Sequence, residues 1–505
     1  MRGKSQDGPA KPFEVPFTHG EGELQARDMT EFDSDHDRTP HVSAFARRRQ
    51  ICWSTSACMI LVYLQRIAPA IAAEGTQKVV TLDALDRLRH SPETMISELG
   101  WTVSEQGWLL GAFFMGYTVS QLPSSFLLRH FGAKTVLVAG LLWSSVFSLL
   151  TPFAAQRSFG LALVCRVMVG MAQGPEFPAS SLLVRNWAPP SETSQSISVV
   201  CAGGYLGAFI ALPLCGWLLV ALGWRSIFFV AGGGGLVFAA WYAQFVGESP
   251  ESDTRISPEE RQHIRTSKAQ SSPWLLEHEV SWMALTGEML CCRAVWAQIF
   301  ASACNNFGFY MLLGEMPTFL RTQLSFSQDR IDLLAPLPYV LMWIVTVASG
   351  YFADYLLANT ELDRLAVRRL CLAISQLPTG AFLLAAAFTQ WQIALACLVM
   401  ATGCNGFFNC SVSANIIETG GRHSATLYAL VNSFGQMPGI FGAPLVGALT
   451  EEFGYEVGFR VAFAICFACY VLGTAFFVNA ASSSKLELGK PASWDDDVEL
   501  SPTKP

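Results

Sequence analysis

Two arginines lie inside long apolar stretches of this 505-residue chain. Arg66 stands in the stretch LVYLQRIAPA, and Arg166 stands in LVCRVMVG. A guanidinium group in hydrocarbon costs at least ~2.5 kcal/mol even on insertion scales, so such residues usually face a protein interior or a water-filled cavity. Arginine also binds carboxylate and phosphate groups well, because its planar fork donates two parallel, charge-assisted hydrogen bonds. The pair is therefore a candidate binding site for an anion.

The two arginines are expected at similar depths in a membrane. A helix that begins near residue 50 on the cytosolic side places Arg66 ~24 Å along its axis. A helix that begins near residue 158 on the opposite side places Arg166 ~12 Å along its axis. In a hydrocarbon core of ~30 Å, both side chains then lie in the half away from the cytosol. The alternatives are that Arg66 snorkels to the far interface and that Arg166 forms a structural ion pair. We favour a shared anion site, since a charge inside a membrane marks a functional site by default.

Polar residues on the same two helices extend the candidate site. Tyr63 lies about one turn before Arg66, so its hydroxyl is placed to donate to an anion or to orient the arginine, unless the ring only packs. Gln173 shares a face with Arg166 but cannot titrate, so proton coupling through position 173 is excluded. Glu176 is the next carboxyl group, and its face is rotated by about 60° from that of Gln173. A buried packing role or an ion pair on the cytosolic side is therefore an equal alternative for Glu176.

Further polar candidates occur in the apolar stretches of the second half of the chain. Asn306 is placed to hydrogen-bond a substrate, although polar packing between helices explains it equally well. Glu315 precedes Pro317 and either binds a cation or anchors a gate, and we favour the gate. A sparse polar face follows later in the chain, made of Asn405, Asn409 and Asn415.

The elements that must position these residues are apolar helices. The chain is 51% hydrophobic and 14% charged, which is about half the charged share of soluble domains. Apolar runs of about 18 or more residues are long enough to cross a bilayer as helices, and most of these runs lack the polar stripe of a soluble helix. We therefore predict an all-α membrane protein with twelve transmembrane helices. Their expected ranges are 50–73, 104–128, 133–155, 158–184, 193–221, 224–246, 294–320, 330–357, 366–388, 391–417, 424–450 and 457–479.

Basic residues predict the orientation of these helices, because Lys and Arg accumulate in cytosolic loops. With twelve helices, the basic segments fall on one side together with both termini, which are therefore predicted to be cytosolic. An odd number of helices would place the C-terminus on the opposite side, and the charge bias argues against it. The basic segments contain Arg47, Arg48, Arg49, Arg129, Lys134, Arg255, Arg261, Arg265, Lys268, Arg293, Arg364, Arg368 and Arg369.

A long basic loop divides the chain into two six-helix halves. Transporters built from such parallel halves bind substrate between them near the middle of the membrane. Arg129 and Asp354 stand in the loops that follow the second and the eighth helix, and we expect them to act in gating. The predicted organisation is a disordered cytosolic tail at 1–45, a first half at 46–246, a cytosolic central loop at 247–293, a second half at 294–480 and a cytosolic tail at 481–505.

Several other classes of protein are disfavoured by the sequence. No basic stripe with interleaved aromatics indicates a nucleic acid partner. The 14 cysteines have neither metal-site nor disulfide spacing, so we expect no metal. The 8 histidines lie mostly outside the expected helices, and no catalytic cluster indicates an enzyme. No cleavable signal peptide is visible before the first apolar stretch.

Ordered motifs make the chain resemble a known family. The matching segments are LLGAFFMGYTVSQLPSSFLLRHFGAK (109–134), RVMVGMAQGPEFPA (166–179), NWAPPSETS (186–194), GWRSIFFVAGG (223–233), ESPESDTRISPEE (248–260), NNFGFYMLLGEMPTFL (305–320), PLPYVLMWIVTVASGYFAD (336–354) and NSFGQMPGIFGAPLVGALT (432–450). They resemble the anion:cation symporter branch of the major facilitator superfamily, which includes sialin, the vesicular glutamate and nucleotide carriers and the sodium/phosphate carriers. The resemblance implies the major facilitator fold and secondary active transport of anions by alternating access, driven by sodium, protons or membrane potential.

The resemblance also bears on single residues. Arg66 and Arg166 match family arginines that are linked to substrate binding or coupling. Many proton-coupled relatives have Glu where this chain has Gln173, which favours sodium or membrane potential as the driving force. Vesicular glutamate carriers have an essential Arg at the position of Asn305 and a His at that of Leu110, so these departures argue against glutamate. The loop after the second helix also lacks the acidic residue that is usual in the family.

We therefore predict a monomeric, multi-pass transporter of a small organic or inorganic anion, of the phosphate or carboxylate class, in a lipid bilayer. The alternative is a transport-inactive sensor or scaffold that has kept the fold. We expect no cofactor beyond a co-transported sodium ion or proton. The sequence leaves open the anion, the coupling ion, the direction of transport and whether Glu176 replaces the missing Glu at position 173. It also leaves open whether the membrane is the plasma membrane or an endomembrane of a vesicle or lysosome-like compartment.

Overall fold

The structure is a computed structural model that describes residues 46–74, 94–101, 103–269, 282–324, 334 and 336–486. All of its described helices belong to one compact unit, Arg47–Pro505. The expected disordered tail at 1–45 and the last part of the expected tail at 481–505 lie outside the described residues.

The first half of the unit contains six spans. Pro123 and Pro175 lie where two of them are interrupted, because proline lacks the N–H group that continues a helical hydrogen-bond ladder. The interrupted spans are α5 (Val103–Gln121) with α6 (Ser124–Phe131), and α8 (Phe159–Gln173) with α9 (Glu176–Trp187). The single helices are α2 (Arg47–Glu74), α7 (Ala133–Arg157), α10 (Thr193–Leu222) and α11 (Trp224–Phe245).

The second half repeats this arrangement with its own interruptions. Three spans are the single helices α14 (Arg293–Thr322), α16 (Leu337–Asn359) and α17 (Arg364–Ala386). The next consists of α18 (Trp391–Asn405), the π-helix η2 (Asn409–Ser413) and α19 (Ala414–Gly420). The last two are formed by α20 (Ser424–Gln436) and α21 (Gly439–Ala480), because the chain turns within α21 at Gly454. Gly454 has φ 76°, a conformation that favours glycine.

The described helices thus make up twelve spans, and the predicted all-α fold with two six-helix halves is confirmed. Within the described part of the chain, 8 helical stretches are long and apolar enough to cross a membrane by length and composition. The interruption at Pro175 leaves α8 with 15 residues and α9 with 12.

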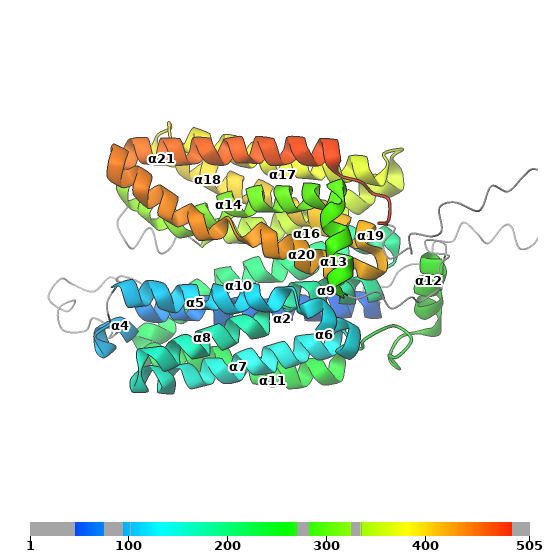
Figure 1. The fold of residues 1–505 in the computed structure, drawn as a ribbon, viewed down its shortest axis with the longest axis horizontal. Helices are drawn as coiled ribbons and strands as arrows, with labels where there is room; N and C mark the ends of the chain where they lie inside the picture. The colour runs from blue at the N-terminus through cyan, green and yellow to red at the C-terminus, as the bar shows by residue number, and fades with distance from the viewer. Residues whose placement is uncertain are drawn as a thin grey trace, which may run out of the picture. The chain divides into compact units, whose positions relative to one another are not determined.

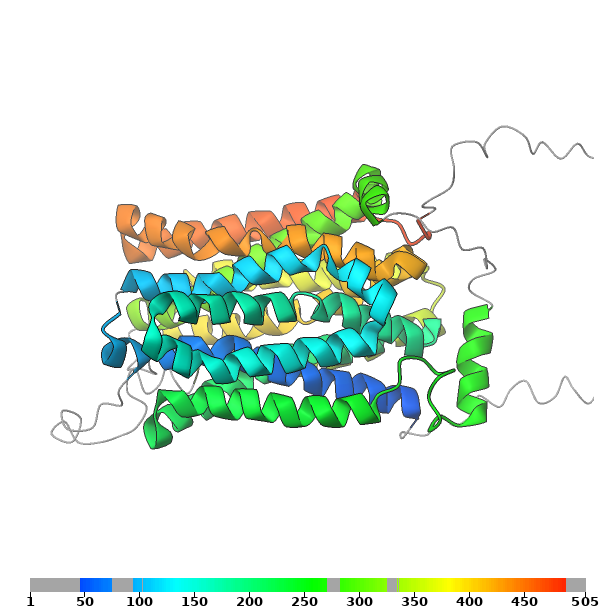
Figure 2. The ribbon, with the colours of Figure 1, turned by 60° about the horizontal axis from the view of Figure 1, so that its bottom comes forward.

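Short helices lie at the two ends of the bundle formed by residues 47–486. Figure 1 shows α4 (Met95–Leu99) at one end and α12 (Pro258–Ala269) and α13 (Trp282–Cys291) at the other, and we call these ends the α4 end and the α12 end. Figure 2 shows the long helices running between the same two ends. Within this bundle, α10 packs against α16, and α20 packs against α9, α6 and α5, so these helices join the two halves.

Glycines set the positions of two side chains in the first half. A Cβ atom at Gly204 would lie 2.7 Å from Cε2 of Tyr63, so α10 packs directly on this ring. A Cβ atom at Gly170 would lie 2.0 Å from the carbonyl oxygen of Phe113, so α8 and α5 are in backbone contact. Small residues allow such close approach of membrane helices. This contact places Arg166 of α8 beside Phe113 of α5.

Candidate functional site

Arg66 of α2 lies among three aromatic rings. Its Cζ atom is 4.7 Å from the ring centroid of Tyr63, 4.8 Å from that of Phe113 and 5.0 Å from that of Tyr117. Two of its donor atoms, Nε and Nη2, are buried and have no hydrogen-bond acceptor. Contact with a ring face attracts the cation but leaves the donors in the guanidinium plane unused. Arg66 therefore presents buried N–H groups that call for an acceptor.

Arg166 of α8 reaches the same Phe113 ring from another helix. Its Cζ atom is 5.4 Å from the ring centroid, its side chain is 2% exposed and its buried Nε has no acceptor. The structure thus brings Arg66 and Arg166 together around Phe113. No carboxylate among the described residues forms a salt bridge with either arginine, so the structural ion pair considered for Arg166 is not found there. Because buried charges are normally paired, the two cations can receive an anion.

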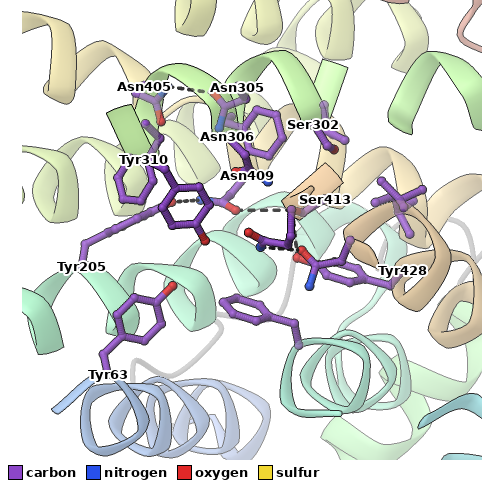
Figure 3. Close-up of a pocket in the computed structure, with 18 residues that line it drawn as sticks. Tyr63, Tyr205, Ser302, Asn305, Asn306, Tyr310, Asn405, Asn409, Ser413 and Tyr428 are labelled. Carbon is purple, nitrogen blue, oxygen red and sulfur yellow. Dashed lines mark hydrogen bonds between the residues drawn. The ribbon is translucent and has the colours of Figure 1, made fainter. Parts of the chain in front are cut away.

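A cavity lies beside Tyr63, and we call it the chamber (Figure 3). It contains about 660 Å³ of empty space, including the part open to solvent. Its walls come from both halves, namely α2, α9 and α10 on one side and α14, α18, η2, α19 and α20 on the other. The amide and tyrosine side chains that line it are Asn305, Asn306, Asn405, Asn409, Asn432, Gln436, Tyr63, Tyr205, Tyr310 and Tyr428.

Hydrogen bonds hold several of these amide groups in place. Asn405 Nδ2 donates to Asn305 Oδ1 at 2.8 Å, which links α18 to α14 (Figure 3). Asn409 Nδ2 donates to the Tyr205 hydroxyl at 3.2 Å and so joins the two halves. Ser413 Oγ donates to Asn409 Oδ1 at 3.3 Å. Asn409 and Ser413 are the first and last residues of the π-helix, an irregularity that is frequent at functional sites.

The structure places the four predicted substrate-binding residues in two adjoining places. Tyr63 and Asn306 line the chamber, whereas Arg66 and Arg166 do not. Tyr63 contacts Arg66 and also lines the chamber, so its ring lies between the cations and the cavity. Asn306 Nδ2 donates to the Gly435 carbonyl at 2.9 Å, so Asn306 also makes the polar contact between helices that was its alternative role.

Gln173 forms part of a buried amide network. Its Nε2 atom donates to the Val62 carbonyl at 3.3 Å and to Gln65 Oε1 at 3.4 Å. Gln65 Nε2 donates in turn to Ser145 Oγ at 2.9 Å. The network joins α8 to α2 and α7, so the contacts of Gln173 are those of a packing residue.

Glu176 begins α9 and is 1% exposed. Neither of its carboxylate oxygens has a hydrogen-bond partner, and no ion pair of Glu176 occurs among the residues that the structure describes. The ion pair considered for it on the cytosolic side is therefore not found. An isolated ionised carboxylate is very costly to bury, so such a group is favoured in its neutral, protonated form.

Asp354 lies at a contact between the halves near the α12 end. Its carboxylate accepts the backbone N–H groups of Ser194 at 3.2 Å and Gln195 at 2.8 Å, at the start of α10. A carboxylate at a helix N-terminus satisfies donors that the helix leaves unpaired. Arg368 Nη1 donates to Ser194 Oγ at 2.8 Å and forms a salt bridge of 2.7 Å with Glu418. Together these contacts fasten α16 and α17 to α10.

Arg129 makes a second contact between the halves, with its Nη2 atom 3.3 Å from His423 Nδ1. The acid that the loop after the second span lacks is supplied from elsewhere in the chain. Glu248, which follows α11, accepts the backbone N–H groups of Ala133 at 2.6 Å and Lys134 at 2.8 Å. Glu248 thus caps α7 within the first half, as Asp354 caps α10 across the halves.

Some residues that line the chamber could not be predicted from the sequence. One predicted residue, Glu315, has a side chain that the structure does not describe. Lone tyrosines such as Tyr205 and Tyr310 are indistinguishable from packing aromatics in an apolar helix. Asn432 and Gln436 carry a detectable signal, because two amides at this spacing lie on one helix face. Glu315 belongs to α14, but its side chain is outside the described part of the structure.

Twelve helical spans in two halves, with a polar chamber between them and buried cations beside it, are the arrangement of a polytopic membrane transporter. The chain belongs to the Major Facilitator Superfamily, whose sequence profile matches residues 91–362 and 358–503.

Its relatives confirm the predicted resemblance to anion carriers. Sialin from Homo sapiens is 32% identical over 381 residues, which cover 75% of this chain and 75% of sialin. Vesicular glutamate transporter 2 from Homo sapiens is 28% identical over 412 residues, or 81% of this chain and 69% of that protein. Probable anion transporter 4 from Oryza sativa subsp. japonica, a chloroplastic protein, is 29% identical over 381 residues, or 75% of this chain and 62% of that protein.

Solved structures share the fold at low sequence identity. The E. coli fucose:proton symporter FucP superposes with a TM-score of 0.57 at 12% identity, covering 84% of this chain and 98% of that chain. The proton:xylose symporter XylE gives a TM-score of 0.60 at 14% identity, covering 87% and 98%. At such identities the likeness concerns the fold alone.

Proposed function

We propose that this chain is a secondary active transporter that moves a small organic or inorganic anion by alternating access. The observation that carries the proposal is the pair Arg66 and Arg166, whose buried donors lack acceptors and which meet at Phe113 beside the chamber. A carboxylate or phosphate group would accept from these donors. The relatives support an anionic substrate, since one is named an anion transporter and another a glutamate transporter.

The contacts between the halves supply the gate in this proposal. Asp354 and Arg129 join the halves near the α12 end. While these contacts hold, the proposal has the substrate enter from the α4 end. Opening toward the other side requires that these contacts break while contacts near the α4 end form. Tyr63, whose ring contacts Arg66 and lines the chamber, is placed to orient Arg66.

The proposal also includes an orientation. The α12 end and both chain termini face the cytosol, because the basic segments gather at that end and positive loops stay cytosolic. The protein acts as a monomer in the plasma membrane or an endomembrane.

Uptake by proteoliposomes that contain the purified full-length chain tests this function. Labelled phosphate, glutamate and glucuronate should be offered separately under sodium and pH gradients. Arg66→Ala and Arg166→Ala should each lower uptake at least about thirtyfold, because removing one side of a buried charged contact costs roughly 2–5 kcal/mol. Arg157→Ala, at an exposed arginine that ends α7, is the matched control and should transport normally.

The outcomes separate transport from the alternative. Wild-type uptake by both arginine variants would remove the assigned anion site. If no anion enters but anions still raise the melting temperature of the protein, the chain is a transport-inactive sensor or scaffold.

A further inference from the structure

Basic side chains from both halves gather near the α12 end, and we call this cluster the basic junction. Arg185 Nη1 donates to the carbonyl oxygen of Arg422 at 3.4 Å, which joins the first half to the second. The charge of Lys485 also acts on that of Arg185. The junction consists of Arg129 of α6, Arg185 of α9, Arg422 and His423 of η3 (Gly421–His423), and Lys485, which lies beyond α21.

His423 lies between two of these arginines. Arg129 Nη2 is 3.3 Å from its Nδ1 atom, and Arg422 Nε donates to its Nε2 atom at 3.0 Å. Burial of the ring, with the charges of Arg422, Arg129 and Arg185, lowers the pKa of His423 to about 4, so the ring is neutral at physiological pH. A neutral imidazole has a single accepting nitrogen, so it cannot accept from both guanidinium groups. The junction therefore concentrates more donors and more positive charge than His423 can take up.

Closure of the halves at the α12 end brings these like charges together. Arg129 and Arg185 belong to the first half, and they meet Arg422 of the second half through the contacts at His423 and at the Arg422 carbonyl. Charges of one sign repel each other, so their approach opposes closure. An anionic group at the junction would relieve this repulsion. Because the junction exists only while the halves are closed, such a group would bind that arrangement better and shift the equilibrium toward it.

The C-terminal segment of the chain leaves the described residues at the junction itself. The Leu486 N–H donates to the carbonyl oxygen of Thr419 at 2.9 Å, which fastens this segment to α19. A Cβ atom at Gly421 would lie 3.9 Å from Lys485 Cδ, so the stem of Lys485 lies against η3. Residues 487–505 follow in the sequence, so they are tethered to the chain at this place.

The tethered segment carries the complementary charge. Asp495, Asp496, Asp497 and Glu499 stand about ten residues beyond Lys485. An extended chain covers up to ~3.3 Å per residue, so this spacing is ample for a return to the junction. A short tether gives an attached group an effective concentration of about millimolar. Ion pairs that would be too weak between separate molecules therefore suffice for binding within one chain.

We propose that the acidic segment 495–499 binds the basic junction of its own chain and holds the halves closed at the α12 end. Its carboxylates accept from basic groups of both halves, so the bound segment bridges them. Release of the segment favours opening at this end, and the segment acts as a built-in inhibitor of opening. This role goes beyond the anion transport proposed above and requires no substrate.

Photo-cross-linking of the full-length protein in phosphatidylcholine nanodiscs tests the contact. Val498→p-benzoylphenylalanine places a cross-linker between Asp497 and Glu499. After irradiation, mass spectrometry of the peptides should find this segment joined to α6, α9 or η3. The yield should fall at least about threefold between about 0.1 M and about 1 M salt, because the screening length falls from ~10 Å to ~3 Å.

Charge variants assign the contact to its two partners. Simultaneous replacement of Asp495, Asp496 and Asp497 by Asn should lower the cross-linking yield at least about threefold, since several ion pairs are lost together. Arg422→Glu, at an exposed position, should have a similar effect from the other side. Arg157→Glu changes an exposed arginine that ends α7 and is the matched control, which should keep the wild-type yield.

Closure is measured separately, with spin labels at exposed positions of α12 and α16. The labels are attached in Glu259→Cys and Asn359→Cys, after Cys291 and Cys292 have been changed to Ser. The helix α12 contacts the first half through the salt bridge between its Glu260 and Arg48, so the two labels report on the separation of the halves. The fraction of molecules with a long distance between the labels should increase in the triple Asn variant and should stay unchanged in Arg157→Glu.

Each outcome bears on the inference without any measurement of transport. Cross-links that join the segment only to residues 1–45 or to lipid would overturn it, as would a yield that salt and the charge variants leave unchanged. The absence of cross-links in protein with wild-type label distances would do the same. If the contact forms but the triple Asn variant keeps the wild-type distances, the segment does not hold the halves closed. Failure of anion uptake would affect the proposed function alone.

Discussion

Glu176 poses the sharpest question at the scale of single residues, because its carboxyl group is buried without a partner. From α7 it faces Gly140, where an added Cβ would lie 3.9 Å from Glu176 Oε1. The group is therefore suited to hold a proton in this state and to release it when its surroundings change. That makes Glu176 the proton-binding candidate that Gln173 cannot be.

We predict that Glu176→Gln uncouples transport from protons. The amide mimics the neutral carboxyl, so the variant should fold and should exchange labelled for unlabelled anion at near wild-type rates. It should lose accumulation driven by a pH gradient, because no proton can then bind or leave at this position. Retained accumulation under a pH gradient would contradict the assignment and would favour sodium or membrane potential. Counterflow and gradient-driven uptake are measured on the same vesicles, with Gln173→Asn as the control in the neighbouring network.

The sequence predicted the charged part of the site better than the uncharged part. Arg66 and Arg166 are conspicuous because a charge in an apolar helix is rare and costly. Tyr205 and Gln436 are uncharged, so the cost of a buried charge does not mark them in the sequence. Their place in the chamber depends on packing between helices that are distant in the chain. Glu176 illustrates a further limit, since sequence spacing alone cannot tell a buried, unpartnered carboxyl from a paired one.

At the scale of elements, two acidic residues cap helices in matching ways. Asp354 caps α10 across the halves, whereas Glu248 caps α7 inside the first half. We predict that Asp354→Asn and Glu248→Gln each destabilise the protein by about 0.3–2 kcal/mol, the value of a negative charge at a helix N-terminus. Only Asp354→Asn should also shift the equilibrium between the arrangement closed at the α12 end and the arrangement open there. The contact of Asp354 with α10 exists only while the halves are closed at that end.

The difference between these variants is measured with spin labels at two exposed or half-buried helix starts, Lys134 of α7 and Arg364 of α17. The fraction of molecules with a long distance between the two labels should increase in Asp354→Asn but not in Glu248→Gln. Equal distance distributions in the two variants would show that the Asp354 contact does not control the closure.

The docking of α12 gives a prediction about pH. Lys268 donates to the carbonyl oxygen of Asn186 in α9, and its burial lowers its pKa to about 8, although Glu251 opposes the shift. The unfolded chain binds this proton up to about pH 10.4, so between the two pKa values the unfolded state holds more protons than the folded state. The contribution of Lys268 to the free energy of unfolding therefore rises with pH from about 8 to about 10. The melting temperature of the wild type should rise relative to Lys268→Met over this window, and parallel curves would contradict the shift.

Helix existence was predictable from apolar runs, but the internal breaks were not all visible. Pro123 and Pro175 explain two interruptions that a proline in a helix makes plausible in advance. The π-helix Asn409–Ser413 has no proline or charge to announce it. It arises where η2 packs against α10 and α17, a contact that no local pattern encodes.

At the scale of the whole molecule, the twelve spans and the two halves followed from apolar length and from basic loops. These signals are strong because backbone polar groups in a bilayer must be hydrogen-bonded within the protein, which only helices and closed barrels achieve. The contacts that join the halves were harder to predict from the sequence, because they depend on which helices of the two halves face each other. Arg368 shows this, since it was counted among loop cations but lies fully buried against Glu418 and Ser194.

The even number of spans leads to a prediction about topology. Both ends of the chain and the α12 segment should lie on one side of the membrane, because each pair of spans returns the chain to the side where it began. Epitope tags at the two termini and a cleavage site inserted after Ala269 should then respond alike to protease added outside sealed vesicles. In vesicles with the cytosolic face inside, all three should be protected, and opening with detergent should expose all three together. A tag at one terminus that is cleaved while the other is protected would require an odd number of spans and would place one half of the transporter upside down.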